Sequence, residues 1–126
     1  MIKHTILIII ILVIIYFASL AYNYAVFSQW RLDPETARSL LKSGRVDLLL
    51  DVRTELERKT LGTVPNDVHI PAADIEKVIP SRYPDKSMVI LVYCNTGHRA
   101  RLATDKLQKL GYSNTYYISS THTTLL

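Results

Sequence analysis

The only cysteine in the chain, Cys94, lies where a nucleophile would be expected in an α/β protein. It follows the six largely apolar residues 88–93, which are typical of a buried strand, and it precedes a short polar loop and a helical pattern. Ligands of open α/β sheets bind at the carboxyl ends of strands. Loop N–H groups and a helix N-terminus supply positive potential there, which favours the reactive thiolate. The pattern therefore predicts a reactive Cys94, although a lone cysteine is in general more often a small buried apolar residue.

The loop and two upstream segments resemble the rhodanese family of sulfurtransferases. The loop, residues 94–100, reads CNTGHRA and has four residues between the cysteine and Arg99, as in the active-site loop of that family. Residues 49–53 (LLDVR) resemble its strand-ending DVR segment, and residues 62–71 (GTVPNDVHIP) resemble its GHIPGAINIP segment. The three motifs occur in the family's order, and the resemblance extends from Leu32 to Ile118.

The resemblance implies covalent catalysis, in which Cys94 attacks the outer sulfur of a donor, becomes a persulfide and passes the sulfur to a thiol or cyanide. The donor would be a small anion similar to thiosulfate. The residues expected to bind it belong to the loop and the helix that follows: Asn95, Thr96, Gly97, His98, Arg99 and Arg101. No cofactor is expected, and no Cys/His spacing predicts a metal site.

Asp51 and Arg53 come at the end of an earlier predicted strand. The resemblance implies that they support the loop from a neighbouring strand end, with Asp51 as a partner of an active-site arginine. An ordinary ion pair at a strand end would explain the two residues equally well. The segment before Gly62 is one residue longer than is usual in the family, and Thr63 replaces the usual histidine, so the local geometry here is open.

Two alternatives to sulfur transfer remain. Cysteine phosphatases have a similar order of strand, loop and helix, but they place five residues between the cysteine and the arginine; here Ala100 occupies that place, which favours sulfur transfer. The other alternative is a catalytically inactive regulatory or docking module at a membrane. It is motivated by residues 119–122 (SSTH), where the family usually has two glycines before a further helix, and by the end of the chain at Leu126. The intact Cys94 argues against it.

Composition limits the choice of function further. A chain of 126 residues accommodates one small domain and an appendage. The formal charge of +4 suits anionic ligands or a membrane surface, but the basic residues are too dispersed to predict nucleic-acid binding. A single cysteine excludes an intramolecular disulfide and is more typical of a reducing compartment.

Residues 1–30 are expected to form a transmembrane anchor in contact with a lipid bilayer. No side chain between Lys3 and Arg31 carries a formal charge, and a helix from Thr5 to Phe27 would reach the hydrocarbon thickness of about 30 Å. A signal peptide cleaved near Ala21 is the alternative, which would lead to export. If the anchor is retained, the positive-inside rule places the domain in the cytoplasm, because more basic residues follow the span than precede it: Arg31, Arg38, Lys42 and Arg45.

Residues 31–126 are expected to form an α/β, rhodanese-like three-layer domain, with a central, mainly parallel sheet flanked by helices and the C-terminal helix apparently missing. Strands are predicted at residues 46–52, 88–93 and 115–118. Helices are predicted to start after Asp33 and after Thr54, which has the spacing of a capping box with Glu57. Further helices are predicted to cover residues 74–79 before Pro80 and to run from the cysteine loop to Gly111. His69 has no partner at metal-ligand spacing and is expected to be structural or exposed.

Overall fold

The domain has three layers, a four-stranded sheet with helices packed on each of its two faces. The computed structural model describes residues 1–126, and its strands are β1 (Leu48–Asp51), β2 (Val68–His69), β3 (Ile90–Tyr93) and β4 (Thr115–Tyr117). All neighbouring strands are parallel, in the order β2-β1-β3-β4, as the strand and helix alternation predicted. Leu50 of β1 pairs with Val92 of β3 in the centre of the sheet, and both are fully buried.

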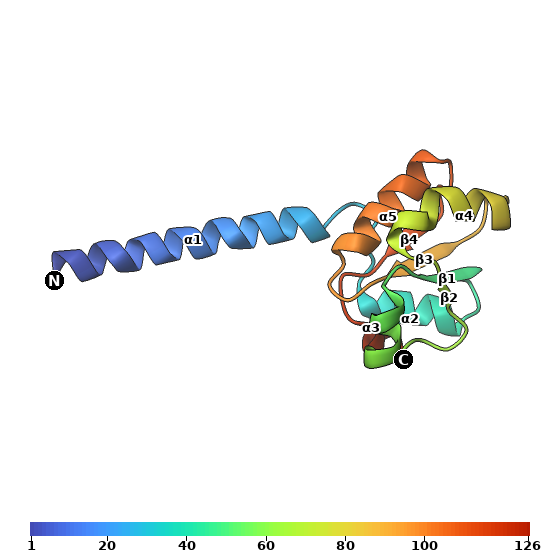
Figure 1. The fold of residues 1–126 in the computed structure, drawn as a ribbon, viewed down its shortest axis with the longest axis horizontal. Coiled ribbons are helices and arrows are strands. Elements are labelled where there is room, and N and C mark those ends of the chain that lie inside the picture. The colour runs from blue at the N-terminus through green and yellow to red at the C-terminus, as the bar shows by residue number, and fades with distance from the viewer.

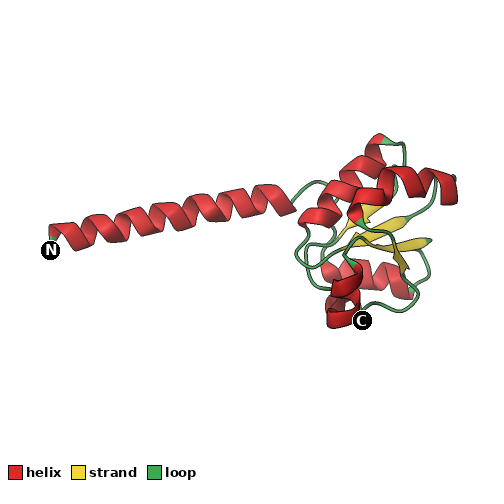
Figure 2. Cartoon of the chain, viewed as in Figure 1, coloured by secondary structure: helices red, strands yellow, loops and turns green.

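The two faces of the sheet bury different residues of the same strands. Leu50 and Val92 belong to the larger apolar core, together with residues of α4 (Ile75–Arg82) and α5 (His98–Lys109). Leu49 and Leu91, one position away, belong to the smaller core on the other face, which α2 (Pro34–Lys42) and the 3₁₀ turn η2 (His122–Leu125) cover. Figure 2 shows these helices on the two sides of the strands. The predicted three-layer α/β fold is therefore confirmed.

Two predicted helix starts have the expected capping bonds. The Asp33 carboxylate accepts the Thr36 N–H at 2.8 Å at the start of α2. Thr54 and Glu57 form the reciprocal capping box at the start of α3 (Glu55–Leu61). The cap fixes the first turn of α3, and with it the place of the Glu57 carboxylate.

The prediction that Pro80 would end a helix at Ile79 is wrong. A 3₁₀ turn, η1 (Ala72–Asp74), leads into α4, which includes Pro80 and ends at Arg82. A proline removes its own N–H donor and its ring crowds the preceding turn, but the residues after it can keep a helical backbone. The Tyr83 N–H closes that turn by donating to the Ile79 carbonyl.

The helix that follows the cysteine loop is α5, and one of its faces is buried. Ala100, Ala103 and Leu107 are buried against the sheet, and Gly111 follows the C-terminal cap with a φ of 98°. Small side chains at the first two positions let the start of α5 lie close to the end of β3.

Helix α1 (Ile2–Val26) projects away from the domain as a single long helix (Figure 1). It has 25 residues, is exposed along nearly all of its length, and is long and apolar enough to cross a membrane, as a signal sequence can be too. Its end contacts the domain: the Tyr117 hydroxyl donates to the Val26 carbonyl at 2.5 Å, and the Tyr117 N–H donates to the Trp30 carbonyl. Trp30 packs partly buried against the larger core.

Candidate active site

Cys94 immediately follows β3, and its side chain is fully buried. Two backbone groups donate to its Sγ: the Gly97 N–H at 3.0 Å and the Ala100 N–H at 3.4 Å. The second donor lies in the first turn of α5, where N–H groups have no partner within the helix. Both donors complement the negative charge of a thiolate, as the sequence of strand, loop and helix predicted.

Gly97 gives the loop its shape. Its φ of 104° lies in the left-handed region that favours glycine, and a Cβ built on it would lie 2.6 Å from the Ser119 Cα and 2.7 Å from the Ser119 Cβ. The loop therefore contacts the segment after β4 directly through its backbone. No residue with a side chain fits at this position without moving one of the two segments.

Arg99 is held by an acidic residue of α3. Its Nη1 and Nη2 donate to Glu57 Oε1 and Oε2, each at 2.7 Å, and the Asn95 side-chain amide also donates to Glu57 Oε2. The bonds from Arg99 are the main reason why the pKa of Glu57 falls from 4.5 to about 2. Sequence reasoning assigned Glu57 only to the helix cap, although the same carboxylate also ties the cysteine loop to α3.

Asp51 and Arg53 form a buried ion pair, and neither side chain has any exposed surface. Arg53 Nη2 donates to Asp51 at 2.9 Å and to the Gly62 carbonyl at 2.7 Å, while Nη1 reaches Asn95 Oδ1 at 3.3 Å. Burial would raise the pKa of Asp51, but hydrogen bonds from Arg53 and Arg58 outweigh it and hold that pKa below its usual value. The pair contacts Asn95 rather than Arg99, so Asp51 is not the partner of the loop arginine.

The ion pair extends into a network that the sequence did not indicate. Arg58 Nη1 donates to Asp51 at 2.8 Å and to Asp67 at 2.7 Å. The Tyr93 hydroxyl donates to Asp67 at 2.5 Å and to Asp51 at 3.1 Å. Burial, followed by the bond to Asp67, raises the pKa of Tyr93, so this hydroxyl stays protonated as a donor. Tyr93 was predicted only as part of an apolar strand, and no local signal in the sequence separates it from a core tyrosine.

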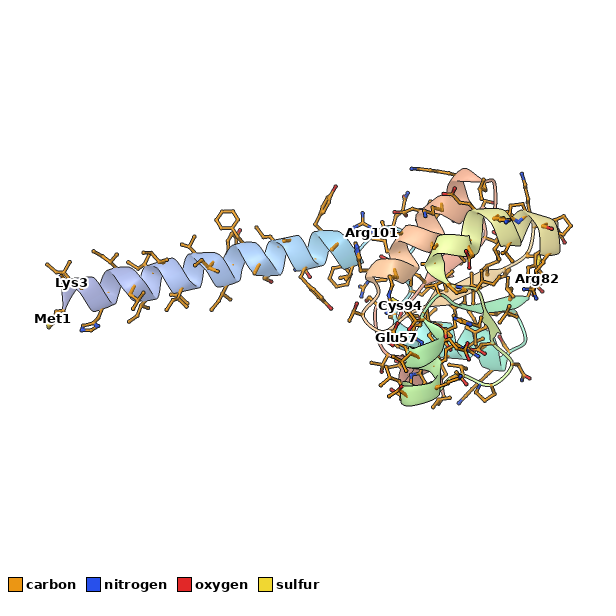
Figure 3. All side chains as sticks on the ribbon, in the orientation of Figure 1. Met1, Lys3, Glu57, Arg82, Cys94 and Arg101 are labelled. Atoms are coloured by element: carbon orange, nitrogen blue, oxygen red, sulfur yellow. The ribbon has the colours of Figure 1, made fainter.

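Other predicted site residues lie toward α1 or toward solvent. His98 Nδ1 is 3.1 Å from the Ala25 carbonyl oxygen, and the Arg101 guanidinium lies 5.4 Å from the centre of the Tyr24 ring. Figure 3 shows Arg101 beside the end of α1, on the side of the domain where Cys94 and Glu57 also lie. Thr96 is exposed. The structure thus groups Cys94 with loop backbone, Asn95 and Arg99, while His98 and Arg101 contact the helix. The donor-binding roles of all six residues stay predictions.

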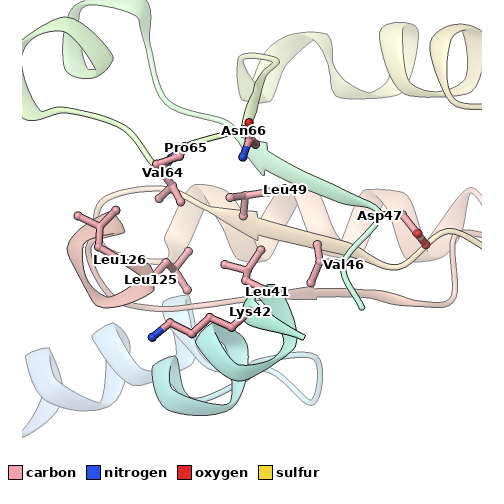
Figure 4. Close-up of a pocket in the computed structure, with 10 residues that line it drawn as sticks. All are labelled: Leu41, Lys42, Val46, Asp47, Leu49, Val64, Pro65, Asn66, Leu125 and Leu126. Carbon is pink, nitrogen blue, oxygen red and sulfur yellow. The ribbon is translucent and has the colours of Figure 1, made fainter. Parts of the chain in front are cut away.

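Two hollows lie on the surface of the domain. A pocket of about 320 Å³ borders the cysteine loop and is lined by Leu61, Asn95, Thr121, His122 and Thr123. A larger, mainly apolar groove of about 520 Å³ lies between α2, residues 64–66 and the C-terminal residues (Figure 4). No residue of the cysteine loop lines the larger groove, whereas Asn95 lines the smaller pocket; Cys94 itself lines neither.

In this domain a loop that begins with a cysteine joins a central strand of a parallel sheet to a helix, and backbone N–H groups donate to the sulfur. This arrangement defines a class of α/β domain. Residues 33–120 match the rhodanese-like domain family, and the chain belongs to this family. It is 31% identical over 65 residues to the thiosulfate sulfurtransferase PspE of Escherichia coli K12. That match covers 52% of this chain and 62% of PspE, so the chain spans less than two thirds of the relative's length.

Solved structures support the same assignment. The human single-domain sulfurtransferase TSTD1 superposes with a TM-score of 0.65 at 26% identity, covering 77% of this chain and 95% of TSTD1. A thiosulfate sulfurtransferase from Pseudomonas aeruginosa superposes with a TM-score of 0.59 at 26% identity, covering 74% of this chain and 18% of that one. The family resemblance inferred from the three sequence motifs is confirmed.

Replacing Gly97 by alanine should disrupt the loop. The left-handed backbone costs a non-glycine residue about 1–2 kcal/mol, and the clash with Ser119 should add about 1–3 kcal/mol. Gly44→Ala is the matched control, because Gly44 has a φ of 72° but nothing within 4 Å of an added Cβ, and it should cost only the backbone term. Trp30 fluorescence, recorded while the full chain is denatured in a mild detergent, measures the loss of stability in both variants. Equal losses of stability in the two variants would show that Ser119 does not constrain the loop.

The ion pair of Glu57 and Arg99 should make stability depend on pH in the acidic range. Because the pKa of Glu57 is lower in the folded chain, its stabilising contribution is complete above about pH 4.5 and is lost as the pH falls toward about 2. We expect Glu57→Gln to be less stable than the unmodified chain at neutral pH, with the difference shrinking toward pH 2. Glu55→Gln, on the same helix with a side chain 65% exposed, is the control. A difference for Glu57→Gln that did not change with pH would contradict the prediction.

Proposed function

We propose that the chain is a membrane-anchored sulfurtransferase that moves sulfane sulfur from thiosulfate, or another small anionic donor, to a thiol or cyanide. The observation that carries this proposal is the Cys94 Sγ at the end of a central strand, with two backbone N–H groups donating to it. The thiosulfate sulfurtransferase activity named for PspE, and the sulfurtransferase name of TSTD1, support the same reaction class. No resident cofactor or metal is part of the proposal.

The reaction has two balanced steps. In the first, the Cys94 thiolate attacks the outer sulfur of thiosulfate, the sulfur–sulfur bond of the donor breaks, and sulfite leaves with the bonding electrons. In the second, an acceptor attacks the outer sulfur of the Cys94 persulfide, and Sγ leaves as the thiolate. The Gly97 and Ala100 N–H groups support both steps, because they already point at the atom on which negative charge returns.

Positive charge for the donor would come from Arg99 and the loop amides. The Arg99 side chain is 36% exposed while Glu57 holds its guanidinium, so it is fixed beside the loop and keeps an accessible face. A bidentate partner pre-organises the guanidinium, and less side-chain entropy is then lost when an anion binds. Asp51 and Arg53 act on the site indirectly, by holding Asn95.

The anchor proposal is based on α1, with Arg31, Arg38, Lys42 and Arg45 on its domain side and only Lys3 before it. This distribution favours a cytoplasmic domain. Export after cleavage of α1 as a signal sequence is the alternative.

A catalytically inactive docking module is the second candidate function. It is favoured by the complete burial of Cys94 and by the pairing of Arg99 with Glu57, since the sulfur becomes accessible only if the loop region opens. Sulfur loading separates the two candidates directly.

Exposure of the purified full chain to thiosulfate should add one sulfur atom to Cys94, because the loop stabilises the attacking thiolate. Intact-mass and peptide mass spectrometry measure the gain, and cyanide should remove the sulfur as thiocyanate. Cys94→Ser should show neither reaction while keeping the Trp30 fluorescence of the fold. A chain that gains no sulfur under these conditions would support the docking module.

The same preparation should show negligible hydrolysis of aryl phosphates, since the loop has one residue fewer than that of cysteine phosphatases. Robust phosphatase turnover that is lost in Cys94→Ser would overturn the assignment.

The chain should remain in the membrane fraction after washing with alkaline carbonate, because α1 is proposed to be retained as a span. N-terminal sequencing of the same material should find residues of the first turn of α1. Release of the domain with a new N-terminus near Tyr22 would favour the signal peptide.

A further inference from the structure

Basic side chains of the domain surround the end of α1. The Arg31 guanidinium lies 4.1 Å from the centre of the Phe27 ring. The Arg101 guanidinium lies 5.4 Å from the centre of the Tyr24 ring, and His98, three residues earlier on α5, contacts a carbonyl of the same helix end. Basic side chains from two distant segments of the chain therefore meet where α1 joins the domain.

The charges of these two arginines are little used inside the protein. The side chain of Arg31 pairs with no carboxylate and donates only to the Ser119 hydroxyl, at 3.3 Å. The ion-pair partner of Arg101 is Asp105, whose Oδ2 lies 3.7 Å from Nε, too far for a hydrogen bond, and Nε has no other partner. Arg99, by contrast, makes two bonds of 2.7 Å to a carboxylate. A contact with an aromatic ring uses the face of a guanidinium and leaves its N–H edge free for an anion.

Exposed apolar groups lie beside these cations. Arg101 and Leu102 follow His98 by three and four residues, which is the spacing that places side chains on one face of a helix. Leu102 is 46% exposed, and the rings of Tyr24 and Phe27 are exposed as well. We call this surface the exit surface of α1; its members are Tyr24, Phe27, Arg31, His98, Arg101 and Leu102.

If α1 spans a bilayer, the exit surface lies at the depth of the lipid headgroups. The helix has 25 residues and is somewhat longer than the hydrocarbon thickness of about 30 Å, so its last turn emerges from the hydrocarbon. Aromatic rings such as that of Tyr24 favour this interfacial layer. The N–H edge of an arginine matches the oxygens of a phosphate, and anionic phospholipids attract basic side chains close to the membrane surface.

We propose that the exit surface of α1 binds the headgroups of anionic phospholipids through Arg31 and Arg101, with Leu102 entering the interface. This proposal rests on the anchor proposed above and goes further by naming a class of lipid. It also assigns Arg101 to the bilayer rather than to the sulfur donor. A soluble anion would need no apolar neighbour, whereas a headgroup lies beside acyl chains that Leu102 and the two rings can contact.

The first test measures the lipid preference of the full chain in detergent. Native mass spectrometry follows its titration with phosphatidylglycerol or with phosphatidylcholine of the same acyl chains. We expect phosphatidylglycerol to bind about tenfold more tightly, and Arg31→Gln and Arg101→Gln each to lower this preference about three- to fivefold, as expected for one cation near an anionic headgroup. The double variant should bind the two lipids almost equally.

Arg82→Gln is the matched control. The Arg82 guanidinium lies 5.6 Å from the centre of the Tyr83 ring, a contact similar to that of Arg101, but Figure 3 shows Arg82 at the end of the domain away from α1. This variant should keep the full preference, and an equal loss in Arg82→Gln would show that only net charge matters. Lys3, at the other end of α1, can also attract anionic lipids. A preference unchanged in both Arg31→Gln and Arg101→Gln would therefore overturn the proposal.

The second test measures how close the exit surface lies to the headgroups in a bilayer. A fluorescent probe is attached to Leu102→Cys in the Cys94→Ser chain, which has no other cysteine, and the chain is placed in lipid nanodiscs with nitroxide-labelled headgroups. Lys109→Cys is the control position, on the same helix about 10 Å further along. Quenching should be stronger at position 102 than at 109, and phosphatidylglycerol should increase the difference. Equal quenching at the two positions would contradict a surface that lies on the membrane.

Failure of the headgroup site can be told apart from failure of the anchor. Release of the domain by alkaline carbonate, with a new N-terminus near Tyr22, would overturn both proposals. A chain that keeps α1 in the membrane but shows no preference for phosphatidylglycerol would overturn the headgroup site alone. Neither result depends on sulfur loading of Cys94, which is measured separately.

Discussion

The cost of burying Arg53 determines much of the local structure around the cysteine. An unpaired buried charge costs several kcal/mol, so the donors of this fully buried guanidinium must all find acceptors. They find them in Asp51, the Gly62 carbonyl and Asn95, which belong to the end of β1, the end of α3 and the cysteine loop. Asp51 in turn accepts from Arg58 and Tyr93. One ion pair thereby ties the end of β1 to the end of α3 and to the cysteine loop, and a shift of Gly62 or Asn95 would leave an N–H of the buried guanidinium without its acceptor.

This network and the sulfur lie on opposite sides of the sheet. Side chains alternate along β3, so Tyr93 belongs to the smaller core and contacts Asp51 and Asp67, while Cys94 belongs to the larger core beside α5. The carboxylates therefore do not oppose a thiolate directly. Their influence passes through Asn95, which both Arg53 and Glu57 contact, and the charge on sulfur is met by backbone N–H groups instead. Because Asp51 and Asp67 lie away from the sulfur, they can hold the loop in place without repelling a negatively charged Cys94.

Much of this arrangement could be predicted from the sequence, because it depends on local chemistry. The apolar runs predicted β1 and β3, Thr54 and Glu57 predicted the start of α3, and the strand, cysteine and glycine order predicted the loop and α5. The partners of Arg99 could not be predicted, since Glu57 and Arg99 are 42 positions apart and meet only when α3 packs beside the loop. Local rules also failed at Pro80, where the helix continues to Arg82 and the Tyr83 N–H closes its last turn on the Ile79 carbonyl.

The end of α1, the proposed anchor, contacts both the cysteine loop and β4. The last carbonyls of a helix have no partner within it, and those of Ala25 and Val26 are used to contact the domain through His98 and the Tyr117 hydroxyl. A carbonyl can only accept, so the His98 proton must be on Nδ1, which leaves Nε2 directed elsewhere. A helix of 25 residues is about 37 Å long, somewhat more than the hydrocarbon thickness of about 30 Å, so a spanning α1 ends near the polar headgroups. Because His98 belongs to the cysteine loop, a spanning α1 would hold that loop close to the membrane surface.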